Sequence, residues 1–259
     1  MTTKISKWPP GTPMWVDLSI DDVESARDFY SRLFGWGYTS DDAAGGYLLA
    51  HLDGHAVAGL GPKDDAALPP SWTTFLSSDD AGATAAQVKA AGGRLLVPPF
   101  DVMDAGRMAV AADSGGAVFG IWQAGNHIGA ERVNEHGSLC WNELHTRDYS
   151  AARSFYADVF GFSYHDIDGH DMVYSTCLRP KDAREVAGIQ LDSALPGETP
   201  DYWLTWFASD DVAATAALAE HLGAKLLMPV SDSPFGRMAI VQGLQGEVFG
   251  LIAVAPAEN

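Results

Sequence analysis

The chain has 259 residues, and 47% of them are apolar, which is enough for one large domain or two of ordinary size with a substantial core. With 16 Lys and Arg against 34 Asp and Glu, its formal net charge of -18 repels phosphate backbones and argues against a nucleic-acid partner. No apolar run approaches the about 18 residues of a membrane helix and the first residues lack a secretion signal, which predicts a soluble, cytoplasmic protein with no membrane partner. The two cysteines, Cys140 and Cys177, are too few for a disulfide framework or a structural zinc site.

The first predicted elements are a strand and a helix within residues 14–36. Asp21 or Asp22 can cap the helix, and Gly35 follows its end. Its apolar face recurs at helical spacing and consists of Val23, Ala26, Phe29, Tyr30 and Leu33. Further strands are predicted at residues 73–77, 95–97, 108–111 and 118–122, with an alanine-rich helix that ends at Gly92–Gly93.

The second half of the chain repeats the first. Residues 14–36 match 140–162 at an offset of 126, and 71–80 match 202–211 at an offset of 131. Later segments match at offsets of 131 and 130, so one insertion and one deletion align the two copies. In the second copy, Asp148 is the predicted cap, Gly161 follows the helix, and the inward face consists of Ala152, Phe155, Tyr156, Val159 and Phe160.

This repeat predicts a two-module chain. We expect an N-terminal tail at 1–11, a first module at 12–122, a polar linker at 123–137, a second module at 138–254 and a C-terminal tail at 255–259.

The motifs of both copies resemble those of the vicinal oxygen chelate superfamily, which includes glyoxalase I, extradiol dioxygenases and bleomycin-binding proteins. They are an A-x-x-F-Y helix, S-x-D-D before a second helix, and D-x-x-G before the last strand. Stretches such as GTPMWVDL, DAGRM and FYADVFG are similar to two-module glyoxalase-like proteins of actinobacteria, a group with a mycobacterial antigen. The resemblance implies an α+β fold, a tandem pair of βαβββ modules (the glyoxalase/bleomycin-resistance fold) whose curved mixed sheets form cups. Such a fold hosts both metalloenzymes and binding proteins.

The resemblance also locates the positions at which metalloenzymes of this superfamily place their ligands. In this chain the eight positions, four per copy, hold Trp15, Gly59, Thr73 and Gly120, and Trp141, Gly188, Leu204 and Gly250. A divalent ion needs two to four His, Asp or Glu side chains, and none of the eight positions supplies one. We therefore expect no metal ion and no cofactor.

Aromatic residues replace those ligands. Trp15, Asp17 and Ser19 are expected to point into a cup from the first copy, and Trp141, Glu143 and His145 from the second. The four glycines would leave room for a flat ligand to approach the backbone. The expected substrate-binding residues are Trp15, Trp141, Phe75, Trp122, Trp206, Thr73, Arg107 and Arg237. The alternative is that these tryptophans fill the cups as core, which is the interpretation we favour for Trp72 and Trp203 on the opposite strand face.

The predicted catalytic residues are Glu143 as a general base, His145 as its partner, and Asp17 at the equivalent position of the first copy. As an alternative, each acid has a structural role and ties down a loop amide or a linker residue such as Arg132. Arg107 and Arg237, both in G-R-M, would clamp a carboxylate or phenolate, or steady the end of the sheet.

Two classes of function follow. The first is a metal-independent lyase, isomerase or cyclase acting on a planar, aromatic or carbonyl-bearing metabolite in secondary metabolism. The second is a protein that sequesters such a metabolite or an antibiotic, and a metal-dependent glyoxalase that detoxifies aldehydes is a further alternative. The partner is a small-molecule ligand, and both a monomer and a homodimer stay open because the tandem chain already pairs its modules.

Overall fold

The structure is a computed structural model that describes residues 3–40, 45–167, 172–195, 197 and 199–253. The expected C-terminal tail, 255–259, lies outside the described residues. Within the described part, no helix is long and apolar enough to cross a membrane.

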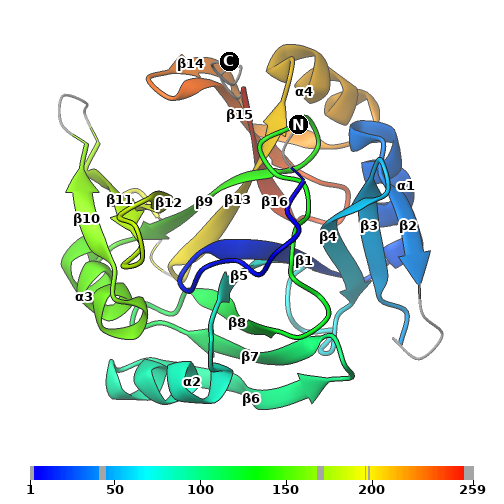
Figure 1. Cartoon of the computed structure of the whole chain (residues 1–259). Helices are drawn as coiled ribbons and strands as arrows, with labels where there is room; N and C mark the ends of the chain where they lie inside the picture. The colour runs from blue at the N-terminus through cyan, green and yellow to red at the C-terminus, as the bar shows by residue number, and fades with distance from the viewer. Residues whose placement is uncertain (1–2, 41–44, 168–171, 196, 198, 254–259) are drawn as a thin grey trace.

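The first repeat forms one eight-stranded mixed sheet with two helices (Figure 1). Its elements are β1 (Pro13–Ile20), α1 (Val23–Phe34), β2 (Gly37–Ser40), β3 (Leu48–Leu52), β4 (His55–Pro62), β5 (Ser71–Ser77), α2 (Ala81–Ala90), β6 (Arg94–Val102), β7 (Gly106–Ala112) and β8 (Val118–Ala124). The strand order is β2-β3-β4-β1-β5-β8-β7-β6, with β1 parallel to β4 and β5 parallel to β8. The sheet therefore consists of two βαβββ units whose first strands pair antiparallel at its centre.

The second repeat builds the same sheet again. Its elements are β9 (Leu139–Thr146), α3 (Tyr149–Phe160), β10 (Ser163–Asp166), β11 (Tyr174–Leu178), β12 (Glu185–Leu191), β13 (Tyr202–Ser209), α4 (Val212–His221), β14 (Lys225–Ser233), β15 (Gly236–Gln242) and β16 (Val248–Ala253). The order β10-β11-β12-β9-β13-β16-β15-β14 matches that of the first sheet, strand for strand. The expected tandem α+β fold is confirmed, and each copy contains two βαβββ units.

The predicted ends of the first helix in each copy are confirmed. The Asp22 carboxylate accepts the backbone N–H of Ser25 at 2.9 Å, and Asp148 accepts that of Ala151 at 3.0 Å. Gly35 and Gly161 end these helices with φ of 75° and 71°, a left-handed conformation that glycine adopts without steric cost.

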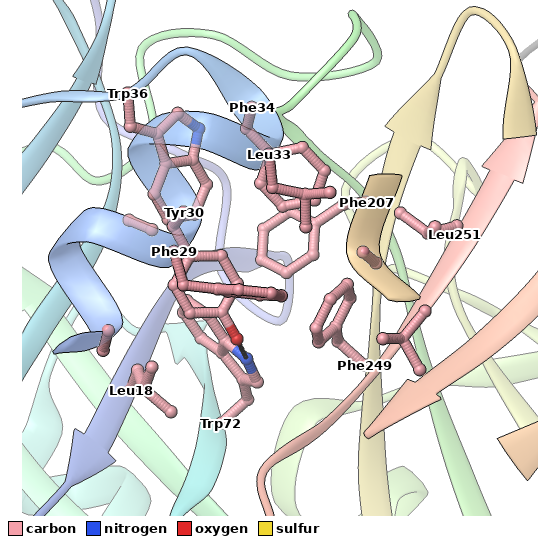
Figure 2. Packing of buried hydrophobic residues seen from close by; sticks show 14 of the residues in the cluster. Leu18, Phe29, Tyr30, Leu33, Phe34, Trp36, Trp72, Phe207, Phe249 and Leu251 are labelled. Atoms are coloured by element: carbon pink, nitrogen blue, oxygen red, sulfur yellow. Dashed lines mark hydrogen bonds between the residues drawn. The ribbon is translucent and has the colours of Figure 1, made fainter. Parts of the chain in front are cut away.

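The two sheets pack through their convex faces, and the two core clusters between them each take residues from both repeats. Figure 2 shows one cluster, in which Phe34 of α1 lies against Phe207 of β13 and Phe249 of β16. Helix α1 lies beside α4 in this half of the molecule, and α2 lies beside α3 in the other (Figure 1). Neither repeat therefore has a complete core of its own.

The core interpretation of Trp72 and Trp203 is confirmed. Both side chains are buried in the convex-face clusters. The indole of Trp72 donates to the hydroxyl of Tyr30 at 3.3 Å, and that of Trp203 donates to the hydroxyl of Tyr156 at 2.8 Å. These two helical tyrosines are the F-Y tyrosines of the repeated motif, so the motif serves the core.

Candidate functional site

The concave face of each sheet is lined by its own repeat. We name the concave face of the first sheet cup one and that of the second sheet cup two. In cup one, Trp15 lies opposite Phe75 in the strand register, and Asp17 lies opposite both Gly59 and Thr73. In the second sheet the register is equivalent: Trp141 lies opposite Trp206, Glu143 opposite Gly188 and Leu204, and His145 opposite Tyr202. The predicted site residues are thus divided between two separate cups.

The expectation that the glycines leave room for a ligand is wrong. A Cβ atom at Gly59 would overlap the Tyr47 hydroxyl and the Asp17 carboxylate, and one at Gly120 would overlap the ring of Phe75. In cup two, the Tyr174 hydroxyl lies over Gly188 and the Trp206 indole lies over Gly250. The absent side chains make room for aromatic residues of the chain itself.

In cup one, the acid is bound by its aromatic neighbours. The indole Nε1 of Trp15 and the hydroxyl of Tyr47 each donate to Oδ1 of Asp17 at 2.7 Å. Loss of water around the carboxyl raises the pKa of Asp17 to about 6, although both hydrogen bonds act in the opposite direction. These contacts favour a structural role for Asp17, as part of the wall of cup one.

The polar linker between the repeats folds onto cup one. The His127 ring lies edge-on to Trp15 with their centroids 4.5 Å apart, and the Trp122 indole donates to the carbonyl of His127 at 3.0 Å. Ala130 is fully buried in one cluster with Trp15, Phe75 and Trp122. Desolvation lowers the pKa of His127 to about 4. For the aromatic residues of cup one, the structure favours the core alternative.

Cup two contains an acid–imidazole–acid arrangement. The Nε2 atom of His145 lies 2.9 Å from Oε1 of Glu143, but this carboxylate is out of line with the ring N–H. On the other side of the ring, Nδ1 lies 3.2 Å from Oδ2 of Asp192. The side chains of Glu143 and His145 are 11% and 8% exposed. Desolvation acts to lower the pKa of His145, but the two carboxylates outweigh it and the pKa is raised. The Tyr202 ring stacks on the imidazole at 4.8 Å and fixes its plane.

Tyr174 extends this arrangement across the cup. Its hydroxyl accepts the indole N–H of Trp141 at 2.9 Å and hydrogen-bonds Glu143. The ring of Phe235, at the tip of the β14–β15 hairpin, lies 5.6 Å from the Tyr174 ring. Since β15 and β11 are distant in strand order, this contact shows that the sheet curls until its two halves meet over the cup.

Sequence reasoning missed Tyr47, Tyr174, Tyr202 and Asp192. Tyr174 follows Tyr47 by 127 residues, close to the offset of 126 in the first helix, so a wider alignment would have paired them. Tyr202 lies on the face of β13 that carries Trp206, which alternation alone indicates. Asp192 comes just after β12, and no sequence signal marks it.

Two further polar groups of cup two have no hydrogen-bond partner among the described residues: the indole N–H of Trp206 and the hydroxyl of Thr176. Both residues are buried, at 4% and 5% exposure. An unsatisfied buried polar group costs about 1–3 kcal/mol. The corresponding residues of cup one are apolar: Phe75 for Trp206, and Leu49, which faces Gly59 as Thr176 faces Gly188.

The remaining predicted residues lie apart from the acids of cup two. Thr73 lines cup one beside Asp17. Arg107 pairs with Asp101 at 2.8 Å and Arg237 with Asp232 at 3.0 Å, each across its own hairpin and each about half exposed. These contacts favour the interpretation in which both arginines steady the end of the sheet.

The residues present do not fit a metal ion of the superfamily type. The eight ligand positions carry no carboxylate or imidazole, and aromatic side chains lie over the four glycines. Within the described ranges, no group of three His, Cys, Asp or Glu is arranged to hold an ion. In cup two, carboxylates face both ring nitrogens of His145 and raise its pKa, and the protonated ring that they favour has no lone pair for a metal ion.

Comparison with known proteins agrees with this architecture. A family model of the Glyoxalase/Bleomycin resistance protein/Dioxygenase superfamily matches residues 13–121 and 138–251. "Putative glyoxylase CFP32" of Mycobacterium tuberculosis is 40% identical over 98% of this chain and 99% of its own length. "Anthracycline biosynthesis protein DnrV" of Streptomyces peucetius is 36% identical over 96% of this chain and 95% of its own.

Among solved structures, the Mn(II)-bound glyoxalase from Novosphingobium aromaticivorans superposes with a TM-score of 0.67 at 17% identity, over 95% of this chain and 83% of its own. At this identity the likeness shows the fold alone. Because the family model matches both repeats along nearly their whole length, the chain belongs to the Glyoxalase/Bleomycin resistance protein/Dioxygenase superfamily.

Proposed function

We propose that cup two binds a planar, partly apolar metabolite with a carbonyl or phenolic oxygen, and that Glu143 and His145 move a proton on it without a metal ion. The reaction would be a lyase, isomerase or cyclase step of secondary metabolism. The observation that carries the proposal is the buried Glu143–His145 pair, held by the partly buried Asp192, beside the half-buried Trp141. Cup one has Ser19 where cup two has His145, and the linker covers its aromatic wall.

In this mechanism the carboxylate of Glu143 takes a proton from a carbon next to the ligand carbonyl. The C–H electron pair moves toward the carbonyl oxygen and gives an enolate. Protonated His145 orients the carboxylate, and Asp192 fixes the imidazole through Nδ1. Glu143 then returns the proton to another carbon, or the enolate expels a leaving group that takes it.

The nature of the ligand is supported from two sides. Trp141, Tyr174 and Trp206 give cup two flat apolar walls, which suit a planar ring system. DnrV is named for anthracycline biosynthesis, and anthracyclines are planar, oxygen-rich polycycles. We infer a ligand of that general chemistry for this chain.

Proton exchange on a simple aryl ketone tests the proposal. The wild type and Glu143→Gln are incubated with 1-tetralone in D₂O, and loss of the proton signal at the carbon next to the carbonyl is followed by NMR. We expect the wild type to accelerate exchange and Glu143→Gln to lower the rate at least a hundredfold while it still binds the ketone, because a positioned base contributes about 10²–10⁴ in rate.

Asp17→Asn is the matched control, because Asp17 is the equivalent acid in cup one and should leave the exchange rate unchanged. An undiminished rate in Glu143→Gln would rule out Glu143 as the base. Binding of 1-tetralone without exchange by the wild type would instead favour the sequestering alternative.

A further inference from the structure

Cup two contains buried hydrogen-bonding groups that take no part in the Glu143–His145–Asp192 arrangement. The Trp206 indole N–H and the Thr176 hydroxyl lie on the concave face, more than nine-tenths buried, and neither meets a partner within the described part of the chain. All other tryptophan N–H groups in that description donate to a protein atom; for example, Trp15 donates to Asp17 and Trp141 to Tyr174. Trp206 is therefore the exception that needs an explanation.

The repeat supplies an internal comparison. At the position of Trp206, cup one has Phe75, whose ring covers Gly120 just as the Trp206 ring covers Gly250. At the position of Thr176, cup one has Leu49, which packs against the apolar cluster of that cup. The same backbone thus accepts apolar side chains at both positions, so packing does not require a donor at either one.

An indole N–H only donates, so its partner must be an acceptor. We propose that Trp206 binds the carbonyl or enolate oxygen of the ligand and thereby selects oxygen-bearing rings over hydrocarbon rings of the same shape. This inference rests on the proposed function of cup two and specifies how the site recognises its ligand. A donor at this oxygen would also stabilise the negative charge that forms when Glu143 removes the proton.

The test compares two ligands of one shape, 1-tetralone and tetralin, which differ by the carbonyl group. Their dissociation constants are measured by ligand-detected NMR for the wild type and Trp206→Phe, and circular dichroism checks that the variant is folded. The substitution gives cup two the residue type that cup one has at this position, Phe75. We expect the wild type to prefer the ketone, and Trp206→Phe to bind the ketone about three- to tenfold more weakly while its affinity for tetralin stays within twofold.

Trp141→Phe is the matched control, because it also removes an indole N–H from cup two, but one that already donates to Tyr174. It should change the affinity for both ligands by the same factor. An unchanged ketone-to-hydrocarbon ratio in Trp206→Phe, or equal affinities in the wild type, would overturn the role of Trp206 and leave the site itself in place. Failure of the wild type to bind either ligand would overturn the proposed function as well.

Discussion

At the scale of the residue, the two equivalent acids of the repeat differ in their surroundings. Asp17 is partly buried and accepts two hydrogen bonds from aromatic neighbours, whereas Glu143 faces an imidazole held by a second carboxylate. Loss of water favours the neutral form of the Asp17 carboxyl in spite of its two hydrogen bonds, whereas Glu143 has a charged partner in the protonated imidazole. The same strand position therefore provides a wall in one cup and a candidate base in the other.

The raised pKa of Asp17 predicts how the stability of the fold changes with pH. Because its pKa is raised from 3.8 to about 6, the folded state binds a proton more tightly than the unfolded state, and Asp17 contributes stability below pH 4 that is lost as pH rises through 6. Asp17→Asn keeps an oxygen acceptor for Trp15 and Tyr47 but does not titrate. Its stability relative to the wild type should rise by about 2 kcal/mol between pH 4 and pH 7. Urea unfolding at a series of pH values measures this, and a flat difference would contradict the account.

At the scale of the element, the linker is part of cup one. Backbone hydrogen bonds join Ala130 to Met14 and Glu131 to Ala56, each at 2.8 Å, and the Trp8 indole donates to the carbonyl of Ala130 at 3.1 Å. The linker thus binds the N-terminal ends of the inner strands β1 and β4 and places His127 against Trp15. The linker therefore connects the two repeats and also packs as part of cup one.

His127 gives the opposite pH dependence in the same cup. Its pKa is lowered from 6.5 to about 4, so its contribution to stability is present above pH 6.5 and is lost as pH falls through 4. His127→Phe keeps an aromatic ring beside Trp15 without a titrating group. Its stability relative to the wild type should fall by about 3 kcal/mol between pH 4 and pH 7. If His127→Phe and Asp17→Asn changed in the same direction in urea titrations, the assignment of these groups would be wrong.

At the scale of the whole molecule, the repeats are bound together by shared cores. Each convex-face cluster takes residues from both sheets. At the centre, the buried Asn142 of β9 accepts hydrogen bonds from Thr74 of β5 and Thr205 of β13, at 2.7 and 3.3 Å. Each cup consequently has both shared clusters behind its sheet.

We therefore expect the chain to unfold in a single transition. Calorimetry should give a calorimetric enthalpy equal to the van't Hoff enthalpy, because loss of either repeat exposes half of both clusters. Trp206→Phe and Asp17→Asn, one in each cup, should shift the same transition rather than split it. Two resolved transitions, each shifted by only one substitution, would show that the repeats fold independently.

The fold could be predicted because the motifs that indicate it are short, local stretches of sequence and because each of them occurs in both copies. Helix caps, the F-Y helix and strand alternation recur in both copies, and alternation correctly placed Trp15 with Asp17 and Glu143 with His145. The rings over Gly59 and Gly188 were beyond prediction, because Tyr47, just before β3, and Tyr174, in β11, meet the glycine strands only in the folded sheet. The linker looked polar, and only the fold brings His127 and Ala130 against a cup.

We propose that cup two, and not cup one, is the ligand site. The chain has eight tryptophans, and each indole N–H gives its own signal in a ¹⁵N–¹H spectrum, which single Trp→Phe variants assign. On titration with 1-tetralone, we predict that the Trp206 and Trp141 signals shift together while those of Trp15 and Trp122 stay in place. Shifts confined to Trp15 and Trp122, with cup two unchanged, would contradict the account.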